Sequence, residues 1–207
     1  MSKFTDFLRN NKNDIFKPII VLLCICIVIP LALSLTNKLT AKKIEELRAQ
    51  NEKAQMSNLI KADEFETISF NGKENFEFNA AKSKTGETLG YIFITSEKGY
   101  GGEVSVMTAI GTDGKIVNVA ILDASGETPG LGQNVTKENF YSQFSGKSGA
   151  TEVVKNGADS AKNEVNAVTG ATISSRAVKN AVNKALSQYS EYSNATSKDT
   201  EVAGSEK

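Results

Sequence analysis

Hydrophobic residues follow three different patterns along the chain. Residues 19–35 form an unbroken apolar run, residues 66–122 alternate apolar and polar positions in short segments, and residues 173–189 repeat apolar positions at helical spacing. Continuous, alternating and helical patterns are typical of a membrane helix, half-buried strands and an amphipathic helix respectively. We therefore expect an α+β protein with one N-terminal transmembrane helix and a domain in which helices pack on an antiparallel sheet.

The first apolar run predicts a membrane anchor. Ile19–Leu35 carries no charged residue and, at about 1.5 Å per residue, spans most of a ~30 Å hydrocarbon core once its flanks are included. A cleaved signal peptide is the alternative, but the run exceeds a usual apolar signal core and residues 36–38 offer no small-residue cleavage site. We predict a tail over residues 1–17 and an uncleaved helix in the lipid bilayer over residues 18–37.

Polar helix formers follow the anchor. Residues 38–62 are rich in Lys, Glu, Gln and Ala, which predicts a helical stalk. A folded domain is expected over residues 63–190, and a disordered tail over residues 191–207, where small polar residues predominate.

Alternation within the domain predicts a sheet. The expected strands are Glu66–Phe70, Glu77–Ala80, Leu89–Thr95, Val104–Ile110 and Ile116–Leu122. Asp113–Gly114 predicts a hairpin turn between the last two strands. A short helix is expected over Thr136–Phe144.

Composition excludes several kinds of chemistry. The chain has no His, and its two cysteines, Cys24 and Cys26, lie inside the apolar run. Histidine-dependent nucleophilic catalysis and His metal sites are therefore excluded, and we expect no metal site and no catalytic residue. The 24 basic and 24 acidic residues cancel, which argues against nucleic-acid binding. An electron-transfer role would require an organic cofactor.

A Gly- and hydroxyl-rich segment precedes the last helix. Val168–Ser175 resembles a turn that leads into a helix N-terminus, where free N–H groups and the helix dipole favour an anion. The alternative is an ordinary hydroxyl-capped helix. The candidate cofactor-binding residues of this segment are Thr169, Gly170, Ala171, Thr172, Ser174 and Ser175.

A second segment, Glu127–Gly132, contains two glycines and a proline. Such a loop is rigid and lets the backbone approach a flat ring closely, although a purely structural turn is the alternative. Its candidate cofactor-binding residues are Glu127, Thr128, Pro129, Gly130, Leu131 and Gly132.

Together the two segments resemble the FMN-binding domain found in RnfG and NqrC subunits of membrane redox complexes. Thr169–Thr172 followed by two serines is similar to the flavinylation motif, and Glu127–Gly132 is similar to a second motif of that family in the same order. Gly99–Gly102 and Gly146–Lys147 also match. The resemblance implies that Thr172 carries FMN covalently through a phosphoester. N–H donors near the ring would favour the reduced, anionic flavin, and the Glu127–Gly132 loop with the nearby backbone supplies the candidate donors.

The resemblance also implies function and partners. It indicates a non-catalytic electron-transfer subunit of an Rnf-type complex that couples ferredoxin/NAD⁺ redox chemistry to Na⁺ or H⁺ translocation, with other membrane and redox subunits as partners. A flavin transferase would install FMN from FAD. Charges on the two sides of the apolar run nearly balance, so the expected extracytoplasmic side of the FMN domain also comes from the resemblance.

Three alternatives stay open. One is an NqrC-like subunit of a Na⁺-translocating NADH:quinone reductase, and another is a free-standing membrane flavoprotein. The third is a membrane-anchored extracytoplasmic binding or scaffold module without flavin. Covalent flavin distinguishes the third from the others.

Overall fold

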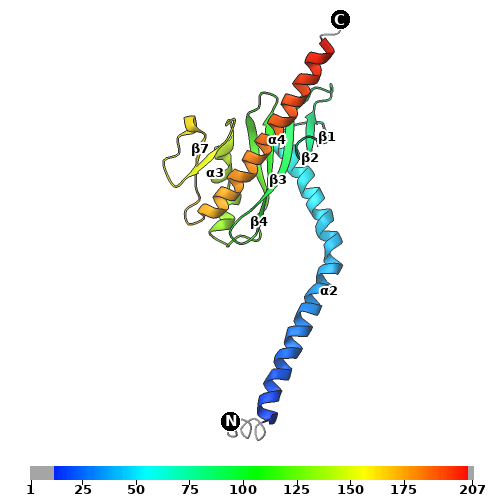
Figure 1. Cartoon of the computed structure of the whole chain (residues 1–207), viewed down its shortest axis with the longest axis vertical. Coiled ribbons are helices and arrows are strands. Elements are labelled where there is room, and N and C mark those ends of the chain that lie inside the picture. Colours follow the sequence, from blue (N-terminus) through cyan, green and yellow to red (C-terminus); the bar gives the residue numbers. More distant parts are fainter. Residues whose placement is uncertain (1–11, 205–207) are drawn as a thin grey trace. The chain divides into compact units, whose positions relative to one another are not determined.

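The computed structural model describes residues 12–204, drawn in Figure 1. The chain forms two compact units that divide between Gln50 and Asn51. This division falls inside a helix and earlier than the boundary expected at residue 63. Residues 1–11 of the expected N-terminal tail and residues 205–207 of the expected C-terminal tail lie outside the described range.

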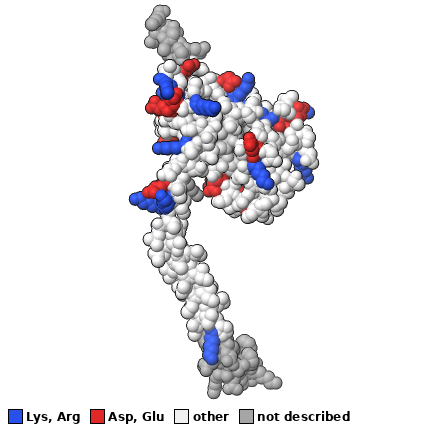
Figure 2. All heavy atoms as spheres, turned by 180° about the vertical axis from the view of Figure 1, so that it is seen from behind, with Lys and Arg blue, Asp and Glu red and all other residues white. Residues whose placement is uncertain are grey.

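The helix α2, Lys12–Leu59, is continuous through the predicted anchor and most of the predicted stalk. Its apolar side chains over residues 19–35 are exposed, with Leu31 at 64% and Leu33 at 65%. Figure 2 shows no charged side chain on the visible face of this stretch. The helix is long and apolar enough to cross a bilayer, judged by length and composition.

Five antiparallel strands form the sheet of the folded unit, in the order β1-β2-β3-β4-β5. Their bounds are β1 Glu64–Asn71, β2 Asn75–Lys82, β3 Thr88–Lys98, β4 Glu103–Gly111 and β5 Ile116–Asp123. All five predicted strands are confirmed. The predicted turn is confirmed as well, because Gly114 donates its N–H to the Gly111 carbonyl at 3.0 Å and adopts a φ of +77°.

Each face of this sheet is covered by a different helix. The helix α4, Thr172–Gly204, crosses β3 and β4 and buries one face (Figure 1). Its core combines Phe78 and Phe93 with Val178 and Val182. The last turn of α2 covers part of the other face. The predicted arrangement of helices packed on an antiparallel sheet is therefore confirmed.

The α4 helix continues past residue 190, where the sequence analysis expects a disordered tail. Glu191 Oε1 accepts a hydrogen bond from the backbone N–H of Lys73, in the turn between β1 and β2, at 2.5 Å. The Tyr192 ring packs against Phe78, with their centroids 4.7 Å apart. These contacts hold the helix beyond residue 190, and the composition of the segment gives no sign of them.

The segment between β5 and α4 is more broken than predicted. The helix expected over residues 136–144 is divided into η1 Gly132–Thr136, α3 Glu138–Tyr141 and η2 Ser142–Phe144. The division occurs at Lys137, whose backbone is extended at φ −79° and ψ 140°. Two short parallel strands, β6 Glu152–Val154 and β7 Glu164–Asn166, flank η3 Ser160–Lys162 and carry no alternation long enough to predict them.

Candidate functional site

A cavity of about 570 Å³ lies between the Glu127–Gly132 loop and the first turn of α4. This size suits a cofactor. Eight of the predicted cofactor-binding residues line it together with Tyr100 and Ile173. The complete lining is Tyr100, Glu127, Thr128, Leu131, Gly132, Gly170, Ala171, Thr172, Ile173 and Ser174. We call this cavity the Thr172 pocket.

The turn before α4 is held by one serine. Ser175 Oγ accepts a hydrogen bond from the Val168 N–H at 3.0 Å and donates to the Ala171 carbonyl at 2.9 Å. Gly170 adopts a φ of +77° within this turn, a conformation that glycine takes without steric cost. Ser175 is therefore a structural residue of the turn, buried behind the pocket.

Three backbone N–H groups remain free where the helix begins. The first intrahelical bond of α4 runs from the Ser175 N–H to the Ala171 carbonyl at 2.9 Å. The N–H groups of Thr172, Ile173 and Ser174 consequently have no acceptor among the described residues. These three residues all line the pocket, so the helix presents its N–H groups and the positive end of its dipole to any anion bound there.

The Thr172 side chain is available at the same point. Its residue is half-buried in the pocket wall, and no hydrogen bond engages its hydroxyl in the part of the chain that the structure describes. The Ser174 hydroxyl is different, because it donates to Glu127 Oε2. Of the four hydroxyl residues within Val168–Ser175, Thr172 is the one that lines this pocket and whose hydroxyl has no hydrogen bond among the described residues.

Glu127 forms the floor of the pocket as a buried acid that is 2% exposed. Its Oε1 accepts hydrogen bonds from the N–H groups of Gly101 at 3.1 Å and Gly102 at 3.4 Å. Burial raises the pKa of this carboxyl, but the hydrogen bonds from Ser174 and the glycine N–H groups outweigh burial, and its pKa lies below the ordinary value. Glu127 thus joins three separate segments around the pocket.

Close packing around Glu127 explains a glycine of the motif. A Cβ atom on Gly132 would lie 2.5 Å from Glu127 Oε2 and 2.8 Å from Ser174 Oγ. Such distances are shorter than van der Waals contact, so the loop passes over the carboxylate only because Gly132 has no side chain.

The rim of the pocket is apolar and open. Tyr100 is 70% exposed, Leu131 47% and Ile173 52%. Exposed large apolar side chains gathered at one site are typical of a surface that binds a ligand or partner. The sequence analysis does not predict Tyr100 or Ile173 as site residues. Tyr100 lies within Gly99–Gly102, which matches the FMN-binding family, and that match could have indicated it.

Four predicted residues lie outside this lining: Pro129, Gly130, Thr169 and Ser175. The Gly130 carbonyl accepts a hydrogen bond from Asn134 Nδ2 at 2.6 Å, which fixes the loop. Lys147, which also matches the family, is buried at 5% exposure, donates from Nζ to Ser160 Oγ at 3.2 Å and does not line the pocket.

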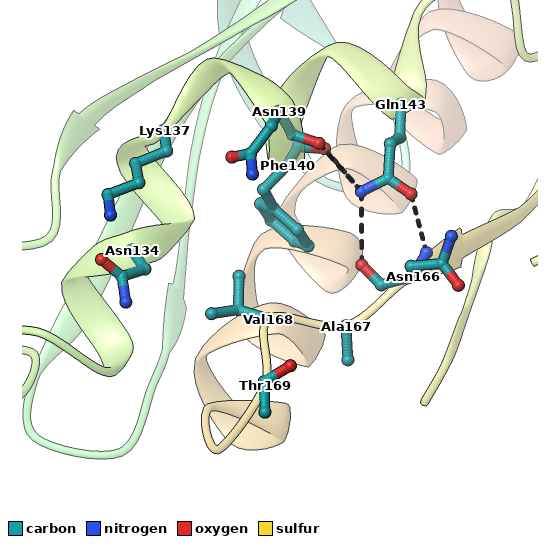
Figure 3. A pocket seen from close by; sticks show the side chains of 9 residues that line it. All are labelled: Asn134, Lys137, Asn139, Phe140, Gln143, Asn166, Ala167, Val168 and Thr169. Carbon is teal, nitrogen blue, oxygen red and sulfur yellow. Dashed lines mark hydrogen bonds between the residues drawn. The ribbon is translucent and has the colours of Figure 1, made fainter. Parts of the chain in front are cut away.

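Thr169 lines a second hollow, of about 430 Å³, shown in Figure 3. Gln143 closes its upper side by accepting from the Asn166 N–H at 2.9 Å and donating to the Asn166 carbonyl at 3.3 Å. The segment 167–172 therefore separates two hollows, with Thr169 on one side and Thr172 on the other.

Comparison with known proteins defines the class of this domain. Residues 99–187 match the family model described as "FMN-binding domain". The matched segment includes Gly99–Gly102, the Glu127–Gly132 loop and the start of α4. The Thr172 pocket therefore lies within an FMN-binding domain, and its free N–H groups and apolar rim suit the phosphate and the flat ring of FMN respectively.

Full-length relatives identify the family more closely. The chain is 37% identical over 191 residues to the G subunit of the Na(+)-translocating ferredoxin:NAD(+) oxidoreductase complex of Acetobacterium woodii, covering 84% of this chain and 91% of the relative. It is 31% identical over 183 residues to the G subunit of the proton-translocating ferredoxin:NAD(+) oxidoreductase complex of Clostridium ljungdahlii, covering 88% and 95%. The chain belongs to this family of G subunits.

A solved structure supports the fold. The crystal structure of the C subunit of the Na(+)-translocating NADH-quinone reductase from Parabacteroides distasonis superposes with a TM-score of 0.53 at 22% identity, covering 69% of this chain and 82% of that one. This likeness bears on the fold alone.

Proposed function

We propose that the chain is a membrane-anchored electron carrier that holds FMN covalently on Thr172. Thr172 Oγ1 would hold the phosphate through a phosphoester, and the apolar rim of the Thr172 pocket would hold the isoalloxazine ring. The observation that carries this proposal is the coincidence, at one point, of an unbonded threonine hydroxyl and three free helix N–H groups. When bound, FMN supplies the redox chemistry, and the chain's own residues retain and orient it.

Attachment requires a flavin transferase that uses FAD. The Thr172 Oγ–phosphorus bond forms, the diphosphate bond of FAD breaks, AMP leaves, and the transferase or solvent takes up the hydroxyl proton. Free N–H groups at residues 172–174 can bind the phosphate oxygens after transfer.

We further propose that the carrier works inside a ferredoxin:NAD⁺ oxidoreductase complex that translocates Na⁺ or H⁺. The relatives of the G-subunit family support this assignment, and α2 supplies the anchor. The FMN domain is placed on the extracytoplasmic side, where covalent attachment prevents loss of a cofactor that is not readily replaced. A membrane-impermeant reagent that modifies the domain in intact cells tests this side, and modification only after lysis would contradict it.

Intact mass and peptide mapping test the covalent bond. Full-length protein produced with a flavin transferase should gain the mass of FMN less one water on the peptide that contains Thr172, with flavin fluorescence in the gel. Thr172→Ala should remove both signals. Ser187→Ala is the control, because it removes a hydroxyl from an exposed position of the same helix outside the pocket and outside both motifs.

Three outcomes would count against this proposal. Flavin retained covalently in Thr172→Ala would move the attachment to another residue, and flavin lost in Ser187→Ala would show that the loss is not specific to Thr172. An unmodified wild-type chain from cells with an active transferase would favour a binding or scaffold module.

A further inference from the structure

Glu127 is a buried acid with no basic partner among the side chains that the structure describes. It is 2% exposed, and its carboxyl accepts hydrogen bonds from the Gly101 and Gly102 N–H groups and is hydrogen-bonded to the Ser174 hydroxyl. No lysine or arginine whose side chain the structure describes forms an ion pair with it. A buried carboxyl group is ordinarily neutralised by a cation or by protonation.

The hydrogen bonds to Glu127 favour its ionised form. Both backbone partners donate to Oε1, and a backbone N–H cannot accept a proton in return. The Ser174 hydroxyl is hydrogen-bonded to Oε2. N–H and O–H donors directed at a carboxyl stabilise its ionised form, which agrees with the lowered pKa of Glu127.

We propose that Glu127 places a fixed negative charge in the wall of the Thr172 pocket and thereby lowers the midpoint potential of the flavin held there. The inference rests on the proposed function for the presence of FMN. Reduction adds negative charge to the ring, and a nearby carboxylate of the same sign makes that charge less favourable. Glu127 is thus a tuning residue that acts through its charge.

This sign is opposite to the effect expected from the sequence. The sequence analysis expects N–H donors around Glu127–Gly132 to favour reduced flavin. The Gly101 and Gly102 N–H groups are instead directed at the carboxylate, and the Ser174 hydroxyl is used in the same way. These donors stabilise the charge of Glu127 and leave the helix N–H groups for the phosphate.

Glu127→Gln isolates the charge from the packing. The amide oxygen can accept from the Gly101 and Gly102 N–H groups, and the amide nitrogen can donate to Ser174 Oγ, whose hydroxyl then acts as an acceptor. In full-length flavinylated protein, we expect the midpoint potential to rise. At a fixed solution potential the ratio of reduced to oxidised flavin should increase roughly tenfold, the size expected for one charge at an intermediate effective dielectric.

Two comparison variants accompany the measurement. Glu77→Gln makes the same charge change on an exposed residue of β2 outside the pocket and should leave the potential within error of wild type. Ser174→Ala removes a hydrogen bond from Oε2 but keeps the carboxylate, so its potential should stay below that of Glu127→Gln. An unchanged or lowered potential in Glu127→Gln, or an equal rise in Ser174→Ala, would overturn the charge effect.

The charge can also be measured in the chain without flavin. Because the pKa of Glu127 is lowered in the folded state, its contribution to stability is complete above the unfolded pKa of about 4.3. It is lost as the pH falls through the lower, folded pKa. Wild type should therefore lose stability relative to Glu127→Gln below about pH 4. A wild type that instead gains stability relative to Glu127→Gln as the pH falls would show a carboxyl that is protonated in the folded state, and would overturn the inference even if Glu127→Gln failed to take up flavin.

The two proposals fail in distinguishable ways. Wild-type protein without covalent flavin contradicts the proposed function and leaves the pH measurement intact. Flavinylated wild type with an unchanged potential in Glu127→Gln contradicts the tuning role alone.

Discussion

Buried polar side chains occur both beneath the Thr172 pocket and on the sheet face under α4, and the two places treat them differently. At the pocket, both oxygens of Glu127 and the hydroxyls of Ser174 and Ser175 are hydrogen-bonded. On the sheet face, Thr95 donates to the Ala181 carbonyl at 2.8 Å, whereas the buried hydroxyl of Thr108 has no partner among the described residues. Hydrogen bonding of these buried polar groups is complete around the carboxylate of Glu127, and incomplete on the sheet face, where the side chains serve packing alone.

Overpacking the pocket floor should have the largest effect on stability. Gly132→Ala places a Cβ 2.5 Å from Glu127 Oε2, and we expect it to lower the free energy of unfolding by about 2–3 kcal/mol. Denaturant unfolding of the full-length chain in detergent measures this loss. Gly130→Ala is the control, because its Cβ meets open space and only its φ of +76° is unfavourable, at about 1 kcal/mol. Equal losses in the two variants would contradict the close packing at Gly132.

Removing the hydroxyl donor to Glu127 should have the next largest effect. Ser174→Ala leaves Oε2 of a buried carboxylate without its donor, and we expect a loss of about 2 kcal/mol in the free energy of unfolding. Ser187→Ala, on an exposed position of the same helix, should be close to neutral in the same denaturant measurement. A neutral Ser174→Ala would mean that the pocket floor satisfies Glu127 by other donors.

Two threonines on the sheet face should respond with opposite signs. Thr108→Val removes an unpartnered buried hydroxyl and should raise the free energy of unfolding by about 1 kcal/mol. Thr95→Val removes a hydrogen bond to Ala181 and should lower it by about 1 kcal/mol. Thermal unfolding of the two variants in parallel makes the comparison, and a shared sign would show that Thr108 has a partner in solution.

Changing the proposed attachment residue should have the smallest effect on stability. The Thr172 hydroxyl has no hydrogen bond within the described residues, so Thr172→Ala should change the free energy of unfolding of the flavin-free chain by less than about 0.5 kcal/mol. Circular dichroism during denaturation checks this. A large loss would show that Thr172 has a structural role, and would weaken any interpretation of its flavin phenotype.

Much of the fold follows from local pattern. The segments that form β3 and β5 alternate or are strongly apolar, and the Asp113–Gly114 turn is a local signal. The strands β6 and β7 have three residues each, too few for periodicity to register. Beyond residue 190, α4 is joined to the sheet by the contact of Glu191 with Lys73, residues 118 positions apart, and no local pattern encodes such a contact.

The sequence predicts where the site lies better than it predicts the role of each residue in it. The two motifs indicate segments that meet at one pocket, since Glu127, Gly132 and Thr172 all line it. Local sequence does not separate Thr172 from Ser174, because both are hydroxyl residues at a helix start. Their difference arises from a buried carboxylate 47 positions before Ser174, which only the folded chain brings into reach.

The continuous helix α4 sets a distance within the domain that resonance energy transfer can measure. The helix begins at Thr172 and is fixed at Glu191 to the backbone of Lys73, about 28 Å further on at the ordinary rise per residue. A dye attached at residue 73 would stand at that separation from a flavin on Thr172, within range of resonance energy transfer. Because a continuous helix sets this distance, a change in transfer efficiency would report fraying of α4 or release of the turn between β1 and β2. The flavin is one of the two chromophores, so a second label is not needed.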